Sequence, residues 1–127
     1  MRFGYAIGLA LLAGTALGAG MMQAINAQTK PPAFLIFDSE VKDQAGYQPF
    51  LQTAVKEIQS QGGKFLVRGA KPEVLSGPPN PNIISISQWN DKESIKRFFD
   101  SEAIKPVREA QSKYTNTRLL IVEGVTP

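Results

Sequence analysis

The chain has 127 residues, of which 43% are hydrophobic and 20% charged, an ordinary composition for one small globular domain. Its net charge of +3 comes from Lys and Arg residues that stand singly along the chain, so no basic stripe indicates nucleic-acid binding. The sequence contains no Cys and no His, which removes the usual thiol nucleophile, general base, zinc ligand and haem ligand. We therefore expect no metal site and no cofactor.

Residues 1–27 have the three parts of a secretory signal peptide. Arg2 makes a positive start, residues 3–22 are uncharged and almost wholly apolar or small, and Ala27 precedes a polar, Pro-rich stretch. We expect cleavage after Ala27, a linker over 28–32, and a periplasmic or secreted mature protein. The alternative is an inner-membrane anchor, because a span of about 20 apolar residues can cross a bilayer. The Gly and Ala content of the stretch favours cleavage.

The first half of the mature chain predicts a strand followed by a helix. Ala33–Phe37 is a short run of aromatic, branched and small apolar residues, which is typical of a buried strand. Apolar side chains then recur at helical spacing over residues 47–58, with Asp43 as the expected N-cap. Pro49 predicts a late start or a kink in this helix, and Gly62-Gly63 predicts its end.

The second half predicts two strands, a broken helix and a last strand. Lys64–Arg68 and Ile83–Trp89 have the composition of strands, and the Pro- and Gly-rich residues between them predict a loop. Residues 90–114 have helical spacing with an interruption near 100–106, and Thr117–Glu123 is an apolar strand.

This order of elements indicates one domain over residues 33–124, preceded by the signal helix. Strand, helix, strand, strand, helix, strand is the βαββαβ pattern of a ferredoxin-like α+β sandwich. Two helices cover one face of a four-stranded sheet, yet the first and last strands are apolar on both faces. A second copy of the chain would cover the other face, so we expect a homodimer that forms a dimeric α+β barrel.

Three short motifs resemble the domain-of-unknown-function-1330 family. They are Gly62–Gly69 (GGKFLVRG), Glu73–Gly77 (EVLSG) and Val122–Gly124 (VEG), where family members carry G-G-x-[YF]-L-x-R-G, L-E-G and v-E-G. The resemblance covers about residues 33–124. It implies a dimeric α+β barrel related in shape to small monooxygenases and isomerases, and it assigns no activity.

The chain departs from the family pattern after its broken helix begins. Residues 101–108 are similar to the family stretch S-P-x-Y-x-P-L-R, but Ile104 stands where Tyr is usual. Gln111 stands where Arg is common. If the family has a polar site in its cleft, the resemblance implies that this member has lost part of it.

Four residues are candidates for contacting a small organic ligand, Tyr47, Arg68, Glu73 and Trp89, and the first, second and fourth also have a structural explanation. Arg68 could clamp an anion, or it pairs with Glu73 or caps loop carbonyls. Tyr47 could donate a proton at the mouth of a pocket, or it packs at the edge of the core. Trp89 could stack on a flat ligand, or it anchors the core. The structural explanation is favoured in each case.

Three function classes remain after these exclusions. The leading hypothesis is an exported dimeric domain that binds a small organic molecule in the cleft between sheet and helices, near Tyr47, Arg68, Glu73 and Trp89. The first alternative is a cofactor-free oxygenase or isomerase acting on an activated aromatic or keto substrate. Its base would be Asp38, Glu73 or Glu123, and Asp38 and Glu123 form a pair only if they point the same way. The second alternative is a structural, envelope-associated dimer without a ligand.

The sequence does not decide whether the protein is an enzyme, and it assigns no catalytic residue. No phosphate loop, dinucleotide fingerprint or metal-ligand spacing is present in it. We expect no contact with nucleic acid, and contact with a membrane only through an uncleaved leader.

Overall fold

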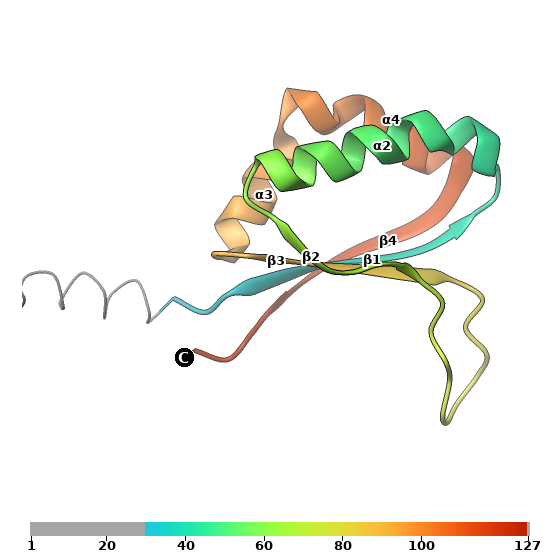
Figure 1. The fold of residues 1–127 in the computed structure, drawn as a ribbon, viewed down its shortest axis with the longest axis horizontal. Coiled ribbons are helices and arrows are strands. Elements are labelled where there is room, and N and C mark those ends of the chain that lie inside the picture. Colours follow the sequence, from blue (N-terminus) through green and yellow to red (C-terminus); the bar gives the residue numbers. More distant parts are fainter. Residues whose placement is uncertain (1–29, 127) are drawn as a thin grey trace, which may run out of the picture. The chain divides into compact units, whose positions relative to one another are not determined.

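Four strands and four helical segments follow one another in the computed structural model, which describes residues 30–126 (Figure 1). The elements are β1 (Ala33–Val41), α2 (Gln44–Ser60), β2 (Lys64–Ala70), β3 (Ile83–Trp89), α3 (Lys92–Asp100), a 3-10 turn (Glu102–Ile104), α4 (Lys105–Tyr114) and β4 (Thr115–Glu123). The predicted order is confirmed, including the break in the second helical segment. The expected signal peptide and its cleavage after Ala27 lie outside the described residues.

The strands form one antiparallel sheet in the order β2-β3-β1-β4, which is the ferredoxin-like arrangement. Both central strands, β1 and β3, pair on two sides, and β2 and β4 form the edges. Strand β1 runs four residues past its predicted end at Phe37, because its polar second half pairs with β4 as far as Val41 opposite Thr115. Asp38 therefore lies inside a strand and not at its end.

Helix α2 is bounded by the residues that the sequence indicated. The Asp43 side chain accepts a hydrogen bond from the Gly46 amide at 3.0 Å, as an N-cap does. The helix starts at Gln44 and continues through Pro49. At its other end Gly62 has a φ of 113°, which a residue with a side chain rarely adopts.

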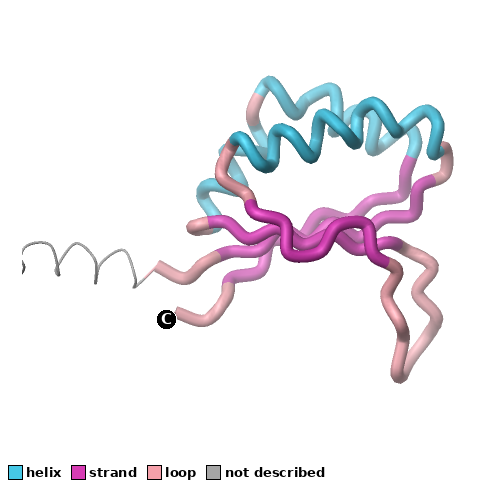
Figure 2. The backbone as a smooth tube through the Cα atoms, in the orientation of Figure 1, coloured by secondary structure: helices cyan, strands magenta, loops and turns pink. Residues whose placement is uncertain are grey.

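The core lies between the helices and one face of the sheet, as Figure 2 shows for the backbone. Trp89 is 2% exposed and its ring centroid lies 5.2 Å from that of Phe98 on α3. The indole N–H donates to the Ser87 hydroxyl at 2.9 Å, so Ser87, one of two serines of β3 that face the helices, is buried with a partner. The rest of the core is aliphatic: Ala33, Leu35, Ala54, Ile95, Ile104 and Val107.

The opposite face of the sheet is apolar, and no helix of the described chain covers it (Figure 2). The register and the alternation of side chains place on this open face Phe34 and Ile36 of β1, Ile84 and Ile86 of β3, Leu120 and Val122 of β4, and Val67 of β2. Leu120 is 40% exposed and Val122 44%. The prediction that β1 and β4 are apolar on both faces is confirmed.

None of the described helices is both long and apolar enough to cross a membrane.

Candidate functional site

A cavity of about 460 Å³ lies between α2 and the helix-facing side of the sheet. Tyr47, Leu51 and Val55 line it from α2, while Phe37, Arg68 and Ile83 line it from β1, β2 and β3. Three exposed glutamines of α2 also line it, at positions 44, 48 and 52. The cavity is therefore apolar at its walls and polar along one helix.

Tyr47 provides a phenol to this cavity. Its side chain is 1% exposed, and its hydroxyl oxygen accepts a hydrogen bond from Gln111 Nε2 of α4 at 3.2 Å. Burial raises the pKa of Tyr47 above its ordinary value of 10.0, and the bond from Gln111 opposes this shift only in part. The group stays a neutral phenol at physiological pH.

Arg68 provides the positive charge of this cavity. Its guanidinium carbon lies 5.5 Å from the centroid of the Phe65 ring. Ladder irregularities flank Val67, and Gly69 has a φ of 62° while its amide donates to Ser85 Oγ at 2.8 Å. A bulge of this kind re-aims the neighbouring side chain. No ion pair joins Arg68 to any carboxylate of residues 30–126, so the predicted alternative of a pair with Glu73 is not formed.

The structure brings two of the four candidate residues together. Tyr47 and Arg68 line the same cavity, whereas Trp89 and Glu73 do not line it. Trp89 is buried in the core, which is the structural alternative for this residue. Glu73 is exposed in the loop over residues 71–82, which extends away from the helices in Figure 1.

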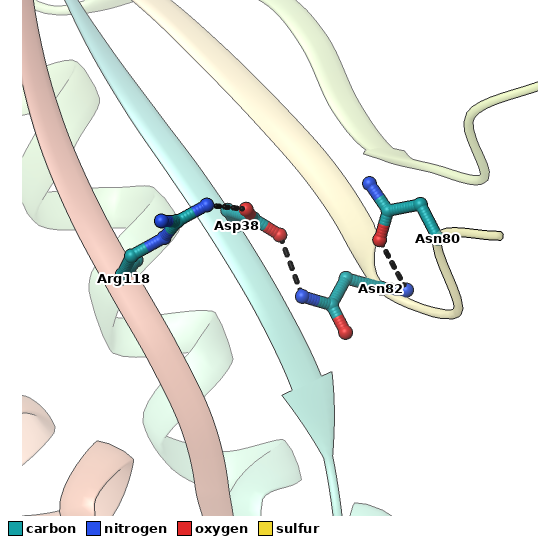
Figure 3. A network of polar contacts seen from close by, with 4 residues as sticks. All are labelled: Asp38, Asn80, Asn82 and Arg118. Atoms are coloured by element: carbon teal, nitrogen blue, oxygen red, sulfur yellow. Dashed lines mark hydrogen bonds and ion pairs between the residues drawn. The ribbon is translucent and has the colours of Figure 1, made fainter. Parts of the chain in front are cut away.

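Asp38 belongs to a separate polar network on the open face, which Figure 3 shows. Its Oδ1 accepts a hydrogen bond from Asn82 Nδ2 at 2.7 Å, and its Oδ2 lies 3.0 Å from Arg118 Nη2. The bond from Asn82, followed by the bond and charge of Arg118, lowers the pKa of Asp38 below 3.8, although burial acts in the other direction. Asp38 is thus a neutralised carboxylate within an apolar surface.

Asp38 and Glu123 do not form a carboxylate pair. Glu123 is opposite Ala33 in the β1–β4 ladder, whereas Asp38 is opposite Arg118. The two acids are five positions apart along the ladder, about 17 Å at ~3.4 Å per residue, and they lie on opposite faces of the sheet. Neither of them lines the α2 cavity, and no other described carboxylate does.

Gln111 does not line the α2 cavity, but it bonds to Tyr47, and sequence reasoning did not predict that contact. Its amide reaches Tyr47 across 64 positions of the chain, and only the packing of α4 on α2 brings the two together. The signal in the sequence was that Gln111 stands where the family commonly has Arg, but the sequence did not indicate which residue Gln111 contacts. Residues 30–126 contain no cluster of three acidic, His or Cys side chains that could hold a metal.

Comparison with known proteins identifies a family and a fold. The family model described as "Domain of unknown function (DUF1330)" matches residues 32–125. Among solved structures, the chain is similar to SnoaB, a cofactor-independent oxygenase from Streptomyces nogalater. The two chains are 13% identical, the match covers 76% of this chain and 96% of SnoaB, and the TM-score is 0.56. It is also similar to RPA0582 from Rhodopseudomonas palustris, of unknown function, with 14% identity over 77% and 85% of the two chains and a TM-score of 0.59. No curated protein matches it. At these identities the structural likeness establishes the fold alone.

Proposed function

The chain belongs to the DUF1330 family, and we propose that this member is an exported homodimer that binds a small organic molecule in the α2 cavity. The observation that carries the proposal is that Tyr47 and Arg68, from different elements, line one cavity with apolar walls. Its volume of about 460 Å³ is in the range of ligand sites in proteins. A cavity of this size favours binding over a purely structural role.

The chemistry of the cavity indicates the kind of ligand. Arg68 has no acidic partner in the described chain and can bind a carboxylate or another anionic oxygen by charge-assisted hydrogen bonds. The phenol of Tyr47 can donate one further hydrogen bond. The apolar side chains of Phe37, Leu51 and Ile83 then contact the body of the ligand. Small organic acids with an aromatic or branched body fit this arrangement.

A thermal-shift panel of aromatic acids, quinols and lipid-like compounds tests the proposal. A compound that binds and is present at a free concentration of 100 times its Kd raises the free energy of unfolding by about 2.7 kcal/mol. This stabilisation produces a measurable rise in Tm. For an acid that binds, we expect Arg68→Gln to weaken affinity at least tenfold, since one charge-assisted bond contributes about 1.5–3 kcal/mol. Arg97→Gln, an exposed arginine of α3, is the matched control. A flat Tm across the panel would count against the proposal.

The proposed partner is a second copy of the chain. The open face carries apolar side chains from all four strands beside the Asp38–Arg118 network, and its exposed leucine and valine on β4 are costly to leave in water. A two-fold arrangement of two such faces buries both, with the helices outside.

A cofactor-independent oxygenase or isomerase is the second candidate. It is favoured by the pairing of a phenol and a guanidinium on one cavity, because together they can stabilise the oxyanion of an activated keto or aromatic substrate. The carboxylates nominated as bases, Asp38, Glu73 and Glu123, do not line this cavity. The test is oxygen uptake and product formation with hydroxylated aromatic and keto substrates. Turnover that persists in both Tyr47→Phe and Arg68→Gln would remove this candidate.

Export is tested by intact mass of the chain expressed with its own leader, in periplasmic and membrane fractions. We expect a mature protein that starts near Gln28 and is found in the periplasm or the medium. A full-length chain confined to the membrane fraction would make the leader an anchor.

A further inference from the structure

A groove separate from the α2 cavity lies on the same, helix-covered side of the sheet, between α3, α4 and the edge strand β4. It consists of two adjacent cavities, which share Phe99 and Leu119 as lining residues. One, of about 540 Å³, is lined by polar groups of α4 and β4, including Arg108, Ser112 and Thr117. The other, of about 310 Å³, has an apolar floor that includes Leu35, Ile95 and Ile121. None of these residues lines the α2 cavity.

The groove follows the helix-facing side of β4. Every second residue of β4 lies on this side, namely Thr115, Thr117, Leu119 and Ile121. The first two are polar and the last two are apolar. Thr115 and Ile121 are six positions apart, a distance of about 20 Å at ~3.4 Å per residue. The groove is thus a long site with a polarity gradient along one strand.

The polar end carries a positive charge that is held in place. The Arg108 guanidinium carbon lies 3.9 Å from the centroid of the Phe99 ring, and Nη1 donates to the Phe99 carbonyl at 3.4 Å. No ion pair joins Arg108 to a carboxylate of residues 30–126. Its remaining N–H groups are available to an anion.

The other charged residues that line the groove do not neutralise Arg108. Lys96 and Asp100 stand one turn apart on α3 and line the apolar cavity, where their opposite charges balance. The polar cavity contains no acidic side chain, and its threonines form a hydroxyl chain in which Thr115 Oγ1 donates to the Gln111 carbonyl. The charge at the polar end is therefore a single unopposed guanidinium.

We propose that the groove between α3, α4 and β4 binds a single-chain amphipathic carboxylate, with the acyl chain over Leu119 and Ile121 and the carboxylate at Arg108. Apolar surface at one end and an unpaired, ring-stacked guanidinium at the other match the two ends of such a ligand. This site is separate from the α2 cavity of the proposed function. It contains Arg108 in place of Arg68, and it is elongated along β4.

The test uses the full chain as it is purified and monomeric decanoate, decanol and decylammonium as probes. We expect decanoate to bind more tightly than decanol, and decylammonium more weakly than both. Amide chemical shifts should change at Thr117, Leu119 and Ile121, and remain unchanged at Phe37, Tyr47 and Ile83. Arg108→Gln should weaken decanoate binding at least tenfold and leave decanol binding within twofold of the unsubstituted chain.

Two further variants show whether a loss of decanoate binding is specific to this groove, and not due to the α2 cavity or to unfolding. Arg97→Gln removes an exposed guanidinium of α3 that lines neither site, and it should leave decanoate binding unchanged. Arg68→Gln should also leave it unchanged, so the two sites succeed or fail independently. Decanoate that binds Arg108→Gln and the unsubstituted chain equally would overturn the proposal. So would shift changes confined to the α2 cavity, or binding of phosphatidylglycerol vesicles in the absence of decanoate binding.

Discussion

Asp38 is an acidic residue that lies on the open face among apolar side chains of the neighbouring strands. Its side chain is 11% exposed and it has two donors, the Asn82 amide and the largely exposed Arg118 guanidinium. Two donors satisfy a buried carboxylate at small net cost, whereas an unpaired one would be strongly destabilising. The network also joins β1 to β4 and to the end of the loop before β3 (Figure 3).

At this scale we predict a pH dependence of stability from Asp38. Its folded-state pKa lies below 3.8, so its stabilisation is complete above that value and is lost as the pH falls through the lower folded-state pKa. Asp38→Asn should lower the free energy of unfolding by about 1 kcal/mol at pH 7. Urea unfolding of both proteins between pH 7 and pH 2 measures this difference, which should shrink in acid.

The control for this prediction is Glu109→Gln, which removes an exposed carboxylate of α4. It should leave the pH profile unchanged. A constant difference between Asp38→Asn and the unsubstituted chain over the whole pH range would show that the charge of Asp38 does not contribute.

At the scale of elements, the Gly62-Gly63 pair joins α2 to β2 for two different reasons. Gly62 has a positive φ and no atom within 4 Å of an added Cβ, so it is required by backbone conformation. A Cβ on Gly63 would lie 2.7 Å from two atoms of the Trp89 indole and 2.6 Å from Ile58 Cγ2. Gly63 is therefore required by close packing of the turn on the core.

Substitution of the two glycines separates these causes. We expect Gly63→Ala to cost about 1–3 kcal/mol by overpacking against Trp89, and Gly62→Ala to cost about 1 kcal/mol or more by backbone strain. Chemical denaturation in a Trp89→Phe background distinguishes the two, because a smaller ring relieves the Trp89 part of the first cost and leaves the second unchanged. Equal costs of Gly63→Ala in both backgrounds would contradict the packing explanation.

At the scale of the whole molecule, the two faces of the sheet set the expected assembly. The helices cover the face that carries Leu35 and Trp89, and the open face retains Leu120 and Val122 at 40% and 44% exposure. Burial of such surface contributes about 25 cal/mol per Å², so a second copy on this face would stabilise both. The α2 cavity and the groove along β4 both lie on the helix-covered side and would remain accessible in that dimer.

We predict that Leu120→Lys converts the proposed dimer into a folded monomer. The charge would lie within the proposed interface, where it is desolvated without a partner. Light scattering at micromolar concentration measures the mass, and circular dichroism checks the fold. Val125→Lys, at an 89% exposed position outside the sheet, is the matched control and should remain dimeric. A monomeric mass for the unsubstituted chain would refute the homodimer.

The local elements of this protein follow from short-range patterns. Helical spacing over residues 47–58, the Asp43 cap and the Gly62 turn depend on neighbours within a few positions, so the sequence by itself determined them. The ends of β1 and β4 were misjudged, because their polar residues extend the strands only through pairing with each other.

Which candidate residues meet was decided by tertiary structure alone. Tyr47 and Arg68 line one cavity because α2 packs over the edge of the sheet, and Trp89 is excluded from it because α3 covers its ring. Asp38 is neutralised by residues 44 and 80 positions away. The sequence determined the periodicities and the turns, and therefore the fold class. The cavities, the buried pairs and the polarity of each face depend on contacts between distant positions, which no local pattern encodes.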